Sequence, residues 1–134
     1  MEMKATFVHA SVRTSNMDRS IEFYTKLLGL KVVKRVEIPQ NNAELVFLQD
    51  PEKEGASLEL TSYRDQKKYV QAKYEDRLFD HLAFVVRSMD ATLGVMRKAG
   101  VTITDEPYRL SPKGNLLAFV EDPDGTLIEL IQRA

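Results

Sequence analysis

Hydrophobic residues recur at helical spacing in two stretches of the chain. Both stripes repeat every three or four residues, which is the period of an amphipathic helix. Their members are Met17, Ile21, Tyr24 and Leu28 in the first stretch, flanked by Phe23 and Leu27, and Met89, Leu93 and Met96 in the second. The pattern therefore predicts two helices, each with one buried face.

Residues at both ends of these stretches support the two helices. Ser15 or Asn16 can cap the first helix, because a short polar side chain accepts a hydrogen bond from the unpaired N–H groups of the first turn. Gly29 suits the position just after its last turn. Ser88 and Gly100 stand at the corresponding places of the second helix.

Short runs rich in Val, Ile, Leu and Phe indicate strands. They lie near residues 6–12, 31–38, 43–49, 57–62, 81–86, 101–104, 116–121 and 126–132. Turn residues at Asp50-Pro51 and at Asp122-Pro123-Asp124-Gly125 make the last two strands of each half hairpins. Two irregular stretches remain, a polar arm over about 64–79 with one or two helical turns, and a Pro/Gly loop over 106–115.

The chain contains one unit twice. HASVRTSNMDRSIEFYTKLLGLKVV, from His9, aligns with HLAFVVRSMDATLGVMRKAGVTI, from His81. LVFLQDPEKEGASLEL, residues 45–60, aligns with LAFVEDPDGTLIEL, residues 117–130. We therefore expect an α+β fold of two βαβββ modules, over about 5–63 and 80–134, related by an internal pseudo-twofold within a single domain.

Composition narrows the functional classes. The chain has 134 residues, 43% hydrophobic and 29% charged, which is typical of one globular domain. Its net charge of −1 argues against nucleic-acid or anionic-membrane partners. We see no leader or membrane span and expect a cytoplasmic protein. Without cysteine, any metal must be bound by His, Asp, Glu or main-chain oxygen.

The repeat also pairs the chain's two histidines with two glutamates. His9 and His81 begin the first strand of each module, and Glu59 and Glu129 lie at matching places in its last strand. A carboxylate in an apolar strand must either lie on a solvent-exposed face or have a polar or charged partner. Imidazole and carboxylate are ligands for divalent transition metals, and four of them leave one or two positions for water or substrate. We therefore expect a metal site, formed where pseudo-twofold packing brings both pairs together.

Over nearly its whole length the chain resembles the glyoxalase I family of the vicinal oxygen chelate superfamily. The similarity is carried by HASVRTSNMDRSIEFYTKLLGLKVV, LEL, DHLAFVV and LLAFVEDPDGTLIELI. Related dioxygenases and resistance proteins usually lack the first-module carboxylate, and the epimerases carry Gln there. Glu59 together with His9, His81 and Glu129 matches the glyoxalase pattern.

The resemblance implies a lactoylglutathione lyase activity and a ligand set. One Ni²⁺, Co²⁺ or Zn²⁺ ion per site would be bound by His9, Glu59, His81 and Glu129. The substrate would be the hemithioacetal of methylglyoxal and glutathione, isomerised to S-lactoylglutathione through an enediolate. Glu129 would be the main base and Glu59 a ligand that takes part in catalysis, in a homodimer whose sites lie at the subunit interface.

The same resemblance implies substrate contacts by Arg13, Arg77 and Lys113, with Tyr63 at a further contact position. Two residues depart from the family pattern: Tyr63 replaces a common Asn, and Asp80 replaces a common Gly before the second His. These departures leave open a related epimerase or lyase that uses another thiol or substrate. A small-molecule binding or resistance protein is the alternative from another class, and an interaction protein would leave the duplicated pairs unexplained.

Overall fold

The structure, a computed structural model, describes residues 3–70 and 73–134. The chain divides into two compact units, Met1–Lys68 and Tyr69–Ala134. This division falls within the predicted arm, close to the predicted boundary between the modules. The organisation of both modules into a single domain stays a prediction.

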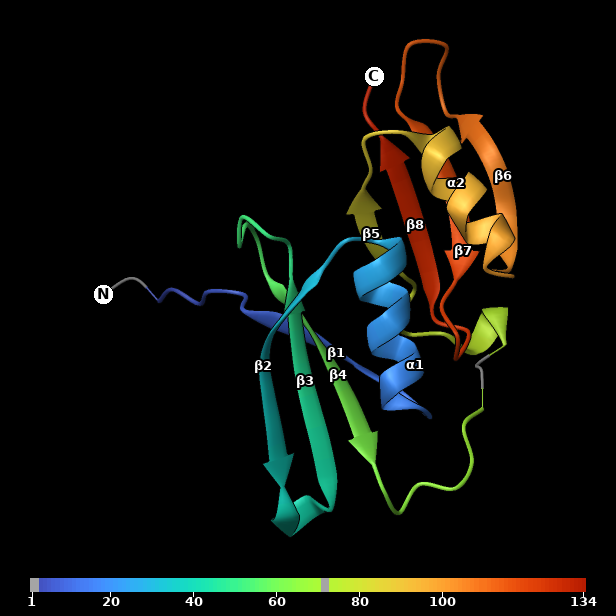
Figure 1. Cartoon of the computed structure of the whole chain (residues 1–134). Coiled ribbons are helices and arrows are strands. Elements are labelled where there is room, and N and C mark those ends of the chain that lie inside the picture. Colours follow the sequence, from blue (N-terminus) through green and yellow to red (C-terminus); the bar gives the residue numbers. More distant parts are fainter. Residues whose placement is uncertain (1–2, 71–72) are drawn as a thin grey trace. The chain divides into compact units, whose positions relative to one another are not determined.

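The first unit contains a four-stranded mixed sheet and the helix α1 (Figure 1). Its elements are β1 (His9–Arg13), α1 (Met17–Glu22), β2 (Lys31–Ile38), β3 (Ala43–Gln49) and β4 (Ser57–Tyr63). The strand order is β1-β4-β3-β2. β1 runs parallel to β4, and the other pairs are antiparallel.

The second unit repeats this topology. Its elements are β5 (Leu82–Val85), α2 (Met89–Lys98), β6 (Ile103–Arg109), β7 (Leu116–Glu121) and β8 (Leu127–Gln132). The strand order is β5-β8-β7-β6, again with a parallel pair followed by antiparallel pairs. The predicted α+β fold of two βαβββ modules is confirmed.

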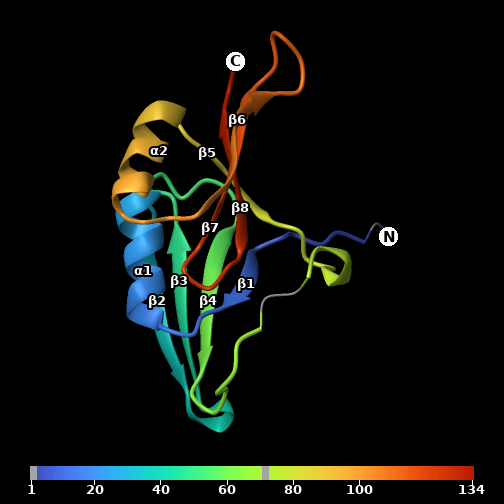
Figure 2. The same cartoon turned by 90° about the vertical axis from the view of Figure 1, so that its right-hand side faces the viewer.

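In each unit the helix lies on one side of its sheet (Figure 2). Val46, Leu58 and Leu60 are buried in the first unit, together with Phe23 and Tyr24 of the helical segment. Because strand side chains alternate, Glu59 points to the opposite face from Leu58 and Leu60. Glu129 is placed in the same way between the buried residues Ile128 and Leu130.

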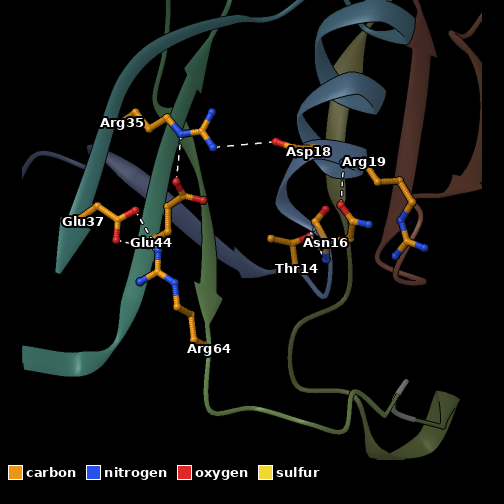
Figure 3. Close-up of polar contacts among 8 residues, drawn as sticks. All are labelled: Thr14, Asn16, Asp18, Arg19, Arg35, Glu37, Glu44 and Arg64. Carbon is orange, nitrogen blue, oxygen red and sulfur yellow. Dashed lines mark hydrogen bonds and ion pairs between the residues drawn. The ribbon is translucent and has the colours of Figure 1, made fainter. Parts of the chain in front are cut away.

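The predicted helix signals are confirmed, and one stripe needs correction. Asn16, not Ser15, caps α1, its Oδ1 accepting from the Arg19 N–H at 3.0 Å (Figure 3). Ser88 caps α2 in the same way. Ile21 is only half-buried, whereas the adjacent Ser20 is fully buried, and a hydrogen bond between its hydroxyl and that of Thr14 satisfies the buried polar group.

The last turns of the first helix also depart from ideal α-helical geometry. Phe23–Leu27 form a π-helical segment, and Leu27 and Leu28, which the helical spacing had placed on the buried face, are only half-buried. Gly29 and Gly100 follow their helices with φ of 76° and 77°, a conformation that favours glycine.

The predicted loop over 106–115 is wrong at its start. β6 continues to Arg109 and includes Pro107. Pro107 lacks an N–H, and β6 tolerates it because it is an edge strand with register shifts between Ile103 and Tyr108. β1 also begins later than predicted, at His9 rather than near residue 6.

Ion pairs lie on the outer hairpin of the first unit, formed by β2 and β3. Arg35 Nε donates to Glu44 Oε2 at 3.0 Å across β2 and β3 (Figure 3). This hydrogen bond and the charge of Glu44 raise the pKa of the Arg35 guanidinium. Arg64, just after β4, pairs with Glu37 at 2.7 Å.

The predicted arm over about 64–79 contains one turn of 3-10 helix, Tyr74–Asp76, in agreement with the prediction. Residues 71 and 72 of the predicted arm lie outside the described residues. Within 3–70 and 73–134, no helix is long and apolar enough to cross a membrane.

Candidate functional site

The first His–Glu pair lies on the parallel strands β1 and β4. His9 begins β1, and Glu59 is the third residue of β4. His9 Nε2 lies 3.3 Å from Glu59 Oε2, and the side chains are 39% and 12% exposed. The pairing of strands distant in the sequence therefore brings together two residues that the repeat had matched.

The second pair is built in the same way in the second unit. His81 immediately precedes β5, and Glu129 is the third residue of β8. His81 Nε2 lies 3.5 Å from Glu129 Oε1, with side chains 31% and 18% exposed. Both predicted pairs thus form, each within its own unit.

Each histidine also contacts a phenylalanine that sequence reasoning had not singled out. Phe47 on β3 packs edge-on against His9 with ring centroids 5.3 Å apart, and Phe119 on β7 does the same to His81 at 5.5 Å. Phe47 and Phe119 are the register partners of Glu59 and Glu129. The signal was present in the repeat, because both occupy the third position of LVFLQD and LAFVED.

The geometry of each pair fits two neighbouring ligands of one metal ion. Ligand bonds of about 2.0–2.2 Å place neighbouring donor atoms about 3.0–3.5 Å apart in octahedral or tetrahedral coordination. The His–Glu separations of 3.3 and 3.5 Å match this spacing. Within the described residues, no cluster of three or more His, Cys, Asp or Glu side chains could hold a metal, and each unit contains one such His–Glu contact.

His81 has a further carboxylate neighbour. Asp80 Oδ2 lies 2.6 Å from His81 Nδ1, on the opposite side of the ring from Glu129. When Nδ1 carries the ring proton, this contact is a hydrogen bond that leaves the Nε2 lone pair directed toward Glu129. His9 is preceded by Val8, so the first pair has no counterpart of Asp80.

Of the predicted substrate-binding residues, the structure brings Arg13 and Tyr63 together. The Arg13 guanidinium lies 4.7 Å from the centre of the Tyr63 ring. Its Nη1 also donates to Gln66 Oε1 at 3.0 Å, a partner that the sequence did not suggest. Arg77 precedes β5, and Lys113 is exposed in the β6–β7 loop, so both belong to the second unit.

Comparisons with known proteins agree with this architecture. A model of the Glyoxalase/Bleomycin resistance protein/Dioxygenase superfamily matches residues 6–130. The lactoylglutathione lyase of Escherichia coli O157:H7 is 35% identical over 126 residues, which covers 93% of this chain and 90% of that protein. A putative lactoylglutathione lyase of Brassica oleracea is 33% identical, and the match covers 97% of this chain.

The chain spans about half the length of the plant relatives it matches, 45% of the Brassica protein and 44% of the Arabidopsis thaliana one. Among solved structures, the trypanothione-dependent glyoxalase I of Leishmania major matches with a TM-score of 0.79 and 35% identity. That match covers 96% of this chain and 87% of the Leishmania chain. The sequence match, the repeated topology and the structural similarity together place the chain in the Glyoxalase/Bleomycin resistance protein/Dioxygenase superfamily.

Proposed function

We propose that this protein is a metal-dependent lactoylglutathione lyase of the glyoxalase I type. Its reaction is the isomerisation of the hemithioacetal of methylglyoxal and glutathione to S-lactoylglutathione, which detoxifies methylglyoxal. The observation that carries the proposal is the pair of matched His–Glu contacts at ligand spacing, 3.3 and 3.5 Å. The names of relatives at 33–35% identity support it.

As ligands we propose His9, Glu59, His81 and Glu129, around one Ni²⁺, Co²⁺ or Zn²⁺ ion. Nitrogen and carboxylate donors suit these borderline ions, and the chain has no thiolate to offer. The bound ion would act as a Lewis acid on two adjacent oxygens of the substrate and stabilise negative charge on them.

The remaining chemistry is proton transfer by a carboxylate. We assign Glu129 as the main base, with Glu59 as a ligand that contributes to catalysis. Glu129 takes the proton from one carbon at a carboxylate oxygen and returns it to the neighbouring carbon, so the reaction needs no oxidant or reductant. The exposed fractions of 18% and 12% leave both carboxylates accessible to a substrate.

Arg13 is the residue best placed to bind a substrate carboxylate. Its stacking on Tyr63 and its bond to Gln66 restrict the long side chain before substrate arrives. A guanidinium held in this way can form two parallel hydrogen bonds to a carboxylate. We assign Arg77 and Lys113 as further cationic contacts.

A second candidate keeps the metal and the proton transfer and changes the thiol. Tyr63 is the observation that favours it, because a phenol at this position offers one hydroxyl where the related family commonly has an amide. The Leishmania relative is described as trypanothione-dependent, so the thiol differs among relatives at this level of identity. A related epimerase, or a small-molecule binding or resistance protein, would share the fold, but pure binding would require neither Glu.

We further propose that the protein is a cytoplasmic homodimer. Each site would then combine the first-unit pair of one chain with the second-unit pair of the other. The absence of cysteine is compatible with a reducing compartment.

The experiment that tests the function is reconstitution of metal-stripped protein with Ni²⁺, Co²⁺ or Zn²⁺. Each form is offered methylglyoxal with glutathione, and with trypanothione in parallel, while thioester formation is followed by absorbance. We expect thioester with at least one metal and none from the stripped protein. Thioester with trypanothione alone would select the second candidate, and no thioester under any condition would rule out both.

A further inference from the structure

The two proposed glutamate ligands have different neighbours. Glu59 Oε1 accepts from Ser11 Oγ at 2.9 Å and from Thr61 Oγ1 at 2.7 Å. The two hydroxyl oxygens are themselves 2.8 Å apart. Each hydroxyl has one proton, and the contact between the two hydroxyls can use only one of them. At least one proton is therefore donated to Glu59 Oε1. Glu59 Oε2, which bears none of these bonds, is the oxygen that faces His9.

Strand register places these hydroxyls at Glu59. Ser11 on β1 is the residue directly opposite Glu59 on β4. Thr61 follows Glu59 by two positions and therefore lies on the same face of the strand. Thr61 is buried, at 4% exposure, so its hydroxyl has few competing partners in water.

The two matching positions of the second unit carry no hydroxyl. Ala83 is the residue opposite Glu129, and Ile131 follows it by two positions. Neither side chain can donate a hydrogen bond. Across the described residues, the only polar side chain in contact with the Glu129 carboxylate is that of His81.

This difference changes what each carboxylate can do. Hydrogen bonds to an ionised carboxylate are strong, and a donated bond on one oxygen with a second hydroxyl packed beside it restricts rotation about the side-chain torsions. Outer-shell hydrogen bonds of this kind orient a ligand and commonly set metal affinity. A carboxylate without such hydrogen bonds can leave its ligand position and transfer a proton at a lower cost in free energy.

We infer that Ser11 and Thr61 are positioning residues that hold Glu59 as the fixed ligand of the site. Their absence from the second unit leaves Glu129 free to act as the mobile carboxylate. This inference deepens the proposed function and rests on it. It assigns different roles to Glu59 and Glu129, although the two units that contain them have the same topology.

The test uses Ser11→Ala, Thr61→Val and the double variant, with Ser62→Ala as the control. Ser62 lies on the same strand, β4, and its side chain points to the opposite face from Thr61. Metal-stripped full-length protein is titrated with Co²⁺ against a chromophoric chelator, and the visible spectrum of the bound Co²⁺ is recorded. We expect the double variant to bind Co²⁺ about 10- to 100-fold more weakly, with an altered spectrum. Ser62→Ala should match the wild type.

A reciprocal variant installs the same hydroxyls in the second unit. Ala83→Ser combined with Ile131→Thr places a hydroxyl opposite Glu129 and another two positions beyond it. We expect Co²⁺ affinity to be kept or raised while kcat falls and KM is unchanged, because the mobile carboxylate has become fixed. A structural role alone for Ser11 and Thr61 would not produce this split.

The outcomes separate this inference from the proposed function. Double-variant protein that binds Co²⁺ like Ser62→Ala, with the same spectrum, overturns the inference and leaves the reaction standing. Weakened Co²⁺ binding without thioester formation from any thiol overturns the reaction and supports the positioning role. Wild-type protein that takes up no Co²⁺ overturns both. If circular dichroism shows that Thr61→Val does not fold, the Co²⁺ affinity and spectrum of Ser11→Ala decide the outcome. Ser11 is an exposed position, so this variant is expected to fold.

Discussion

At the scale of single residues, the two glutamates occupy positions that a strand pattern alone makes unfavourable. Glu129 is flanked by Ile128 and Leu130, both fully buried. Its own side chain lies on the other face of β8, beside His81 and 18% exposed. The cost of placing a carboxylate in an apolar run is therefore small, and the charge remains available to a cation.

Substitution of Glu129 by Gln tests its role as the proton carrier. The amide keeps the size and one oxygen donor but cannot accept the proton, so we expect kcat to fall about 10²- to 10⁴-fold. Co²⁺ affinity should fall much less than turnover. Steady-state kinetics and a chelator competition measure the two quantities. Retained turnover would move the base to Glu59 or to a water molecule.

Asp80 gives a second prediction at this scale. Its carboxylate lies 2.6 Å from His81 Nδ1 and is 73% exposed. We expect Asp80→Ala to weaken metal binding by about 10-fold, near the lower end for outer-shell groups because the contact is open to solvent. Asp105→Ala, which removes an exposed carboxylate from β6, is the matched control. Equal affinities of the two variants would show that Asp80 does not orient His81.

At the scale of secondary-structure elements, an ion pair connects α2 with the edge strand β6. Arg97, in the last turn of α2, donates to Glu106 through Nη1 at 3.2 Å and Nη2 at 2.5 Å. The hydrogen bond with Arg97 lowers the pKa of the Glu106 carboxyl, although both groups are exposed. This contact helps to hold β6, whose ladder is interrupted around Pro107.

The sign of that pKa shift predicts how the contact depends on pH. Because the pKa is lowered in the folded state, the contribution to stability is complete above the ordinary carboxyl range and is lost as pH falls through the lowered pKa. Glu106→Gln should therefore be slightly less stable than wild type at neutral pH and equal to it in acid. Urea unfolding at both pH values measures the difference, which added salt should reduce. A difference that persists in acid would contradict the ion-pair explanation.

At the scale of the whole molecule, the proposed function requires two His–Glu pairs, and each unit supplies one. This division makes the homodimer proposal testable by complementation. A variant without His9 and Glu59 and a variant without His81 and Glu129 should each be inactive alone. Mixing them under conditions that exchange subunits should restore activity if each site draws on two chains.

The expected recovery follows from counting sites. Random exchange makes half of the dimers mixed, and one of the two sites in a mixed dimer is intact, so about a quarter of wild-type activity should return. Sites formed within one chain would give no recovery. Native mass spectrometry of the mixture confirms that subunits have exchanged.

Much of this organisation could be read from the sequence. The sequence predicted the helical stripes, a cap of α1 by Ser15 or Asn16, the Ser88 cap of α2 and most strand boundaries. It also predicted the pairing of His9 with Glu59 and of His81 with Glu129. These features depend on local periodicity, on turn chemistry and on a repeat, and all three are properties of the sequence itself. The π-helical turn and the extension of β6 were missed, because packing at the edge of each element overrides local preference.

Only the tertiary structure decided how the two pairs differ. Ser11 and Glu59 are far apart in the chain, and the parallel register of β1 and β4 sets them opposite each other. The same register in the second unit offers Ala83 to Glu129. Register depends on long-range strand pairing, and a shift of one residue would turn these side chains to the other face. The sequence by itself therefore determined which residues are candidates for the chemistry, and the fold decided which of the two glutamates has hydroxyl neighbours.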